Sequence, residues 1–123
     1  MKSFFTIPGI PVAKPRMTRR DKWAKRPCVV RYFEWCDVAR RAAKKRSETP
    51  SKLTIVFYLP LPSNAKKRGI LPGDWHRAKP DIDNLCKSVM DSLWEDDSRI
   101  YSIAAAKMYD DGRGPRVELW VEG

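Results

Sequence analysis

Residues 79–93, with the sequence KPDIDNLCKSVMDSL, place an amphipathic helix directly after a proline and two aspartates. Apolar side chains recur with the period of an α-helix, which predicts a helix from about Asp83 to Trp94 with one face in a core. The apolar stripe consists of Leu85, Cys86, Val89, Met90 and Leu93. This helix needs a sheet or a second helix to cover its stripe, so the stretch indicates a layered domain.

The start of this helix holds two carboxylates in a defined arrangement. Pro80 disfavours a helical backbone at Lys79. If Asp81-Ile82-Asp83 is extended, both aspartates point to one side and Ile82 points to the core. Asp83 is then the N-cap residue, and Lys87 and Asp91 follow it at four-residue spacing on the polar face of the helix.

Apolar runs on both sides of this helix predict the remaining elements. In chain order the sequence predicts a strand at 4–7, a helix at 30–46, a buried strand at 53–59, the helix at 83–94, and strands at 100–108 and 117–121. The Asp-Gly pair in 109–114 predicts a hairpin turn between the last two strands. Residues 63–79 are expected to form a long connection without regular structure, which flanks the functional site and orders on binding.

This β-α-β-α-β-β order predicts a single α+β domain over residues 1–123, with one mixed or antiparallel sheet and two helices packed on it. The amino-terminal segment has no apolar run long enough for a signal peptide, and no run approaches the ~20 residues that span a membrane. The three cysteines, Cys28, Cys36 and Cys86, form no zinc pattern with the single histidine, His76. We therefore expect reduced thiols in a cytoplasmic protein.

Positive charge dominates the composition. The chain has 25 Lys and Arg against 15 Asp and Glu, a formal net charge of +10. The basic residues cluster in 13–27, 40–46 and 66–68, which favours nucleic acid as the binding partner over a basic surface that serves only solubility. The sequence lacks a basic amphipathic helix of the kind that binds membrane surfaces. The candidate DNA contacts are Lys14, Arg16, Arg19, Arg20, Lys22, Arg77 and Lys79.

Acidic residues are concentrated around the 83–94 helix. Asp81 and Asp83 precede it, and Asp96 and Asp97 follow it. Carboxylates repel phosphates unless a divalent cation lies between them, and hard oxygen ligands are those that Mg²⁺ takes. The cluster therefore favours a metal site. A ladder of surface ion pairs from Asp83 through Lys87 to Asp91, with Asp83 serving only as a cap, is the alternative interpretation.

The string KPDIDNLCKSVMDSL followed by WEDDSRI resembles the signature of the RusA family of Holliday-junction resolvases, which are common in bacterial prophages. The family pattern is D-x-D-N-x-x-K-x-x-x-D-x-L, then a D-D pair before a strand. The resemblance covers Lys79 to about Met108 well. The amino-terminal Pro-Gly-Ile-Pro and the Lys-Pro-Arg at residues 14–16 are similar to the family more loosely.

This resemblance implies an endonuclease that depends on Mg²⁺, with Mn²⁺ as a substitute, and that hydrolyses phosphodiester bonds at four-way DNA junctions in recombination and repair. It implies a homodimer in a bacterial or phage-infected cell, with Asp81, Asp83 and Asp97 as metal-binding carboxylates and Lys87 as a catalytic lysine. The family commonly has extra turn residues after the position of Leu93, so Asp96 is retained as a second metal-ligand candidate beside Asp97.

Two other functions are compatible with the same residues. One is a non-catalytic, basic nucleic-acid-binding protein whose acidic cluster is structural. The other is a metal-dependent nuclease that acts on flaps, other branched DNA or RNA. Metal-dependent cutting separates the junction nuclease from the first, and substrate preference separates it from the second.

Overall fold

The computed structural model describes residues 2–16, 26–43 and 49–123. Its elements are β1 (Lys2–Pro8), α1 (Pro27–Ala42), β2 (Lys52–Leu59), α2 (Ala65–Arg68), α3 (Ile82–Leu93), β3 (Ser102–Tyr109) and β4 (Arg116–Glu122). The predicted α+β fold with one sheet is confirmed. The predicted DNA contacts Arg19, Arg20 and Lys22, and the last residues of the predicted 30–46 helix, lie outside the described residues.

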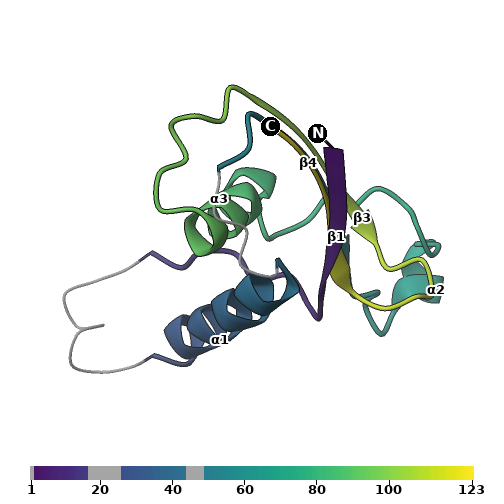
Figure 1. The fold of residues 1–123 in the computed structure, drawn as a ribbon. Coiled ribbons are helices and arrows are strands. Elements are labelled where there is room, and N and C mark those ends of the chain that lie inside the picture. The colour runs from purple at the N-terminus through teal and green to yellow at the C-terminus, as the bar shows by residue number, and fades with distance from the viewer. Residues whose placement is uncertain (1, 17–25, 44–48) are drawn as a thin grey trace.

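The four strands form one mixed sheet in the order β1-β4-β2-β3. β4 pairs antiparallel with both β1 and β2, whereas β2 and β3 are parallel. Parallel neighbours need a crossover connection, and α3 lies in the connection from β2 to β3. Figure 1 shows α1 and α3 on one side of the sheet.

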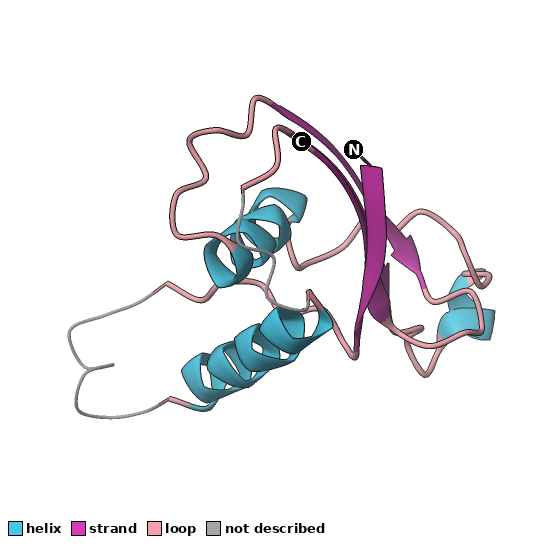
Figure 2. Ribbon diagram, viewed as in Figure 1, coloured by secondary structure: helices cyan, strands magenta, loops and turns pink. Residues whose placement is uncertain are grey.

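The core lies between this face of the sheet and the two long helices. Phe57 and Ile55 of β2, Leu119 of β4 and Leu85 and Val89 of α3 are completely buried. Along β2 the buried side chains alternate with more exposed ones, and Figure 2 shows the two long helices on one side of the strands. The predicted buried strand is therefore buried on its helix-covered face, and its other face carries no long helix among the described residues.

The predicted hairpin of the last two strands is wrong. β2 lies between β3 and β4, and the Asp110 amide donates to the Leu59 carbonyl at 2.7 Å where the connection crosses the end of β2. The Asp-Gly turn itself does form: Asp110 Oδ1 accepts from the amides of Gly112 and Gly114, whose φ values are 104° and 100°. Turn chemistry fixed the local bend but did not decide which strand would be the neighbour of β4.

The connection at 63–79 also differs from the prediction. It contains α2 and an antiparallel bridge between Trp75 and Met108, so part of it forms an extra edge beside β3. Helix α1 begins at Pro27, earlier than the predicted Val30, because a proline at the first helical position loses no hydrogen bond. The three cysteines form no disulfide among the described residues, and Cys36 is buried.

Candidate active site at the start of helix α3

Asp81 lies where the chain enters α3. It is the N-cap residue, with φ −69° and ψ 142°, and its carbonyl accepts from the Leu85 amide at 3.1 Å. The prediction that Asp83 caps the helix is therefore wrong, since the helix begins at Ile82 and Asp83 lies in the first turn. Ile82 is 38% exposed, not directed into the core, because Asp81-Ile82-Asp83 is not an extended segment.

The two aspartates leave their carboxylates available. No side-chain hydrogen bond caps α3, and both Asp81 and Asp83 are exposed. Asn84 and Lys87 are exposed on the same end of the helix. Negative charge is favourable at this end, because the helix dipole places partial positive charge there.

The alternative ladder of ion pairs is not formed. Among the described residues, Lys87 makes no ion pair, and Asp91 Oδ2 instead lies 2.7 Å from Lys14 Nζ. Lys14 was predicted to contact DNA, but here its ammonium ties the amino-terminal segment to α3. Arg40 of α1 strengthens the same region by donating to the Ser92 carbonyl.

Basic residues lie on the approach to the aspartates. Arg77 and Lys79 are exposed in the segment that leads into α3, and Arg16 is exposed in the amino-terminal segment. In α2, Lys66, Lys67 and Arg68 are also exposed. Because α2 follows the end of β2, and Lys107 near the end of β3 bonds to the Pro80 carbonyl, α2 and Asp81 lie at the same end of the parallel strand pair.

Asp96 and Asp97 lie at the other end of α3. The Asp96 carbonyl accepts from Thr49 Oγ1, close to the start of β2, and its carboxylate accepts from the Ser98 amide at 3.0 Å. Hydrogen bonds from the side chain and backbone of Ser98 lower the pKa of Asp96. Asp97 is exposed, and its carbonyl accepts from the Ile100 amide. The Asp96 carboxylate thus accepts a hydrogen bond within its own turn, so Asp97 is the better candidate for a metal ligand.

Helix α3 separates the two acidic pairs. Its 12 residues correspond to a length of about 18 Å at a rise of ~1.5 Å per residue. Within residues 2–16, 26–43 and 49–123, no group of three or more His, Cys, Asp or Glu side chains could hold a metal ion. Asp81 and Asp83 are therefore neighbours in the chain at the start of α3, whereas Asp96 and Asp97 follow the other end of the helix.

The pair at the start of α3 nevertheless suits Mg²⁺. This ion is commonly held by one or two carboxylates and completes its octahedron with water and substrate phosphate oxygens. Asp81 and Asp83 supply two hard, exposed carboxylates that no capping hydrogen bond occupies. The pair therefore fits the metal as the part of its ligand set that lies at this end of α3.

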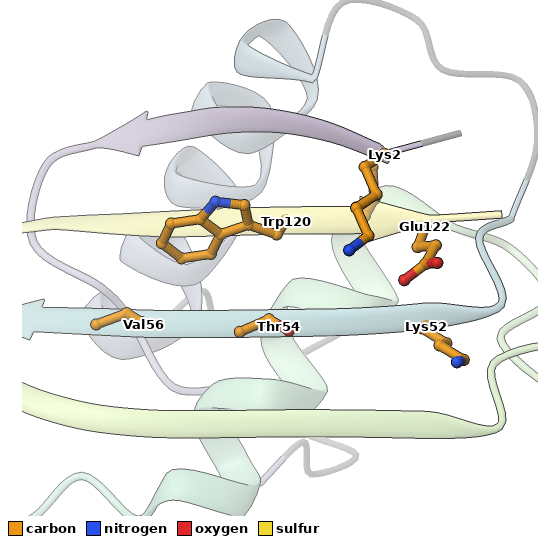
Figure 3. Close-up of a pocket in the computed structure, with 7 residues that line it drawn as sticks. Lys2, Lys52, Thr54, Val56, Trp120 and Glu122 are labelled. Carbon is orange, nitrogen blue, oxygen red and sulfur yellow. The ribbon is translucent and has the colours of Figure 1, made fainter.

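A hollow of about 410 Å³ lies on the sheet face away from α1 and α3. Figure 3 shows the Trp120 ring on β4 with Lys2, Lys52 and Glu122 toward one end of the hollow. None of the candidate site residues lines it. The exposed carboxylates at the start of α3, rather than this hollow, mark the candidate active site.

Comparison with known proteins agrees with the resemblance of the acidic motif. The family model described as Endodeoxyribonuclease RusA matches residues 8–122. This chain belongs to the RusA family. A similar relative is the uncharacterized protein YqaN of Bacillus subtilis (strain 168), which is 34% identical over 138 residues, covering 95% of this chain and 93% of YqaN.

Membership of the RusA family makes the protein a nuclease, and the matched residues include Asp81 and Asp83. The match includes β2, α3, β3 and β4, so the whole sheet belongs to the family domain except for most of β1. In the described part of the chain, no helix has the length and apolar character needed to cross a membrane.

Proposed function

We propose that this RusA-family protein is a Mg²⁺-dependent endonuclease that cuts branched DNA, with four-way junctions as its preferred substrate and Mn²⁺ as a substitute ion. The observation that carries the proposal is the pair of exposed, uncapped carboxylates of Asp81 and Asp83 beside Lys87, in a protein of net charge +10. The basic surface attracts DNA phosphates, but the two carboxylates repel a phosphate unless a divalent cation lies between them.

In this proposal, Asp81 and Asp83 hold the ion at the start of α3. When bound, Mg²⁺ would supply Lewis-acid activation of a phosphoryl oxygen and of the attacking water. Lys87 lies one helical turn after Asp83, where its ammonium stabilises negative charge that develops on the scissile phosphate. Arg77, Lys79 and the basic residues of α2 hold the flanking phosphates, and so place the DNA backbone over the carboxylates.

We further propose a homodimer in which the second copy supplies Asp97. Since the whole of α3, a helix about 18 Å long, lies between Asp81 and Asp97, and no three acidic side chains in the described part of the chain could hold a metal ion, a three-carboxylate site needs a carboxylate from a second copy. In a two-fold dimer with antiparallel α3 helices, Asp97 of each copy would face Asp81 and Asp83 of the other. Two such sites related by the dimer axis suit the two-fold symmetry of a four-way junction.

The test of the activity compares a synthetic four-way junction with a linear duplex of matched sequence, in Mg²⁺ and in EDTA. Paired nicks in opposing strands of the junction, only with the divalent ion, support the proposal. Equal cutting of the linear duplex contradicts junction preference. Tight binding without cutting by the unmodified protein favours the non-catalytic alternative.

Substitution separates chemistry from binding. Asp81→Asn or Asp83→Asn should lower the cleavage rate at least about 100-fold, more than the loss typical of a metal site's outer partners. Junction binding should be unchanged or tighter, because removal of negative charge eases the approach of phosphate. Asp37→Asn, at an exposed position on α1, is the control and should keep full activity. A large drop in melting temperature for both site variants would indicate a structural role instead.

Mixing two inactive variants tests the shared site. In a mixed dimer of Asp81→Asn and Asp97→Asn chains, one shared site keeps Asp81 from one copy and Asp97 from the other. The mixture should therefore nick one strand of the junction. If each site were formed within one chain, the mixture would stay as inactive as its components. Sedimentation at several protein concentrations establishes the dimer independently.

A further inference from the structure

Lys107 connects the sheet to the segment that leads into α3. On β3 it stands opposite Phe57 of β2, whose side chain is completely buried on the helix-covered face of the sheet. The Lys107 side chain therefore starts from the same face as α3. Its Nζ donates to the Ala78 carbonyl at 2.5 Å and to the Pro80 carbonyl at 2.7 Å.

These bonds fix the chain immediately before Asp81. The Pro80 carbonyl is held by Lys107, and the Asp81 carbonyl is held by the Leu85 amide at 3.1 Å. The backbone of Asp81 thus lies between two anchors, one from the sheet and one from the first turn of α3. Since an aspartate carboxylate is separated from its backbone by a single methylene group, anchoring the backbone restricts where the carboxylate can lie.

The segment before these carbonyls is also attached to β3. The His76 amide donates to the Lys107 carbonyl at 3.0 Å, and the Tyr109 amide donates to the Asp74 carbonyl at 2.8 Å. The His76 ring packs on Tyr109, with 4.5 Å between ring centroids. Residues 74–76 are therefore already fixed by backbone bonds to β3, whereas residues 78–80 are held to the sheet by the Lys107 ammonium.

We propose that Lys107 is a positioning residue for Asp81 and Asp83: its ammonium holds the turn at 78–80 so that the two carboxylates converge on one ion. This inference rests on the proposed function of the two aspartates. It assigns a role to a residue outside the acidic motif, and the only signal in the sequence is a lysine within the apolar strand at 102–109. Lys107 would act through the backbone of residues 78–80, to which its ammonium donates.

The experiment compares Lys107→Met, which removes the donors at nearly constant length, with Lys107→Arg, which keeps donors and charge. Lys52→Met is the matched control, because Lys52 is an exposed lysine on β2. Hydrogen exchange of the backbone amides is measured without metal or DNA. Mn²⁺ binding to the free protein, and kcat and KM for junction cleavage, are measured separately.

For Lys107→Met we expect exchange of the Leu85 amide to accelerate about fivefold or more, as for loss of a supporting hydrogen bond, while β2 and β4 stay protected. The Kd for Mn²⁺ should rise about tenfold or more, the loss typical when an outer partner of a metal ligand is removed. The value of kcat should fall with little change in KM. Lys107→Arg should recover most of both losses, and Lys52→Met should match the unmodified protein.

Unchanged exchange and Mn²⁺ affinity in Lys107→Met would overturn the inference, as would acceleration spread evenly over the sheet. If Lys107→Met fails to fold, Lys107→Gln, which keeps one short donor group, is judged by the same criteria. If the unmodified protein neither binds Mn²⁺ nor cuts DNA, the proposed function fails. The exchange comparison then still decides whether Lys107 holds the turn at 78–80.

Discussion

At the scale of single residues, the best-developed polar cluster surrounds Arg116. This side chain is buried, stacks 3.8 Å from the centroid of the Tyr58 ring, and donates to both carboxylate oxygens of Asp111 at 3.0 and 3.1 Å. Glu118 lies 3.3 Å away. The cluster joins the loop after β3 to the outer face of β4 and β2, and it holds the pKa of Asp111 well below its usual range, chiefly through the hydrogen bonds from Arg116.

This cluster predicts a specific response to acid. The folded-state pKa of Asp111 lies below its unfolded value of about 3.9, so its stabilising contribution is complete above that value and is lost as pH falls toward the folded pKa. Asp111→Asn should destabilise the protein at neutral pH by about 1–3 kcal/mol, because it leaves Arg116 poorly paired. The difference in melting temperature between the two proteins, measured from pH 2 to 7, should become smaller toward the acid end. A constant difference across that range would show that ionisation of Asp111 contributes nothing.

At the scale of elements, α3 is the helix that links the core to the candidate site. Leu85 and Val89 are completely buried, while Asp81 and Asp83 are exposed one turn earlier. Ser88 and Ser92 are also buried, and each hydroxyl donates to the carbonyl three residues before it. Small, internally bonded serines let the helix lie close to its neighbours without an unpaired polar group. The position of the aspartates therefore depends on how α3 packs.

Truncation of the buried stripe tests this dependence. Leu85→Ala should lower the free energy of unfolding by about 2–5 kcal/mol, the range for a fully buried leucine. Ile82→Ala, on the same helix but 38% exposed, should cost much less. Urea denaturation measures both. Similar losses for the two variants would mean that α3 is not held chiefly by its buried face.

At the scale of the whole molecule, exposed basic residues lie at both ends of the sheet, and Asp81 lies at one of these ends. The exposed cluster Lys66, Lys67 and Arg68 lies at that end, whereas Lys2 and Lys52 lie at the opposite end of the sheet, beside the hollow in Figure 3. If DNA binds over the candidate site, only the first cluster releases counterions on binding. The two clusters therefore predict different salt dependence.

Replacement of Lys66, Lys67 and Arg68 by alanine should reduce the slope of log K against log salt by up to about 2.7 for each protein chain in the complex, at ~0.9 per phosphate contact. Cleavage by the saturated complex should change little, because these residues hold flanking phosphates. The double replacement of Lys2 and Lys52 by alanine is the control and should leave the slope unchanged. If the control flattens the slope instead, the DNA lies across the open face of the sheet.

Local chemistry accounts for what the sequence determined. The stripe from Leu85 to Leu93 fixed the second long helix to within about a residue at each end, and alternation at Val117, Leu119 and Val121 fixed the last strand. The string from Lys79 to Leu93 was also sufficient to indicate the family, since motif residues are adjacent in the chain. These features depend on residues that are close together in the sequence, so they can be predicted from the sequence alone.

Tertiary structure alone decided which distant groups meet. The insertion of β2 between β3 and β4, the pairing of Lys14 with Asp91 and the bonds from Lys107 to the turn before Asp81 each join residues far apart in the sequence. Strand neighbours and ion pairs are chosen by competition among all compatible partners once the core is packed, and no local pattern ranks them. For the same reason the sequence suggested one metal site made by aspartates from both ends of α3, whereas no three acidic side chains in the described part of the chain could hold a metal ion.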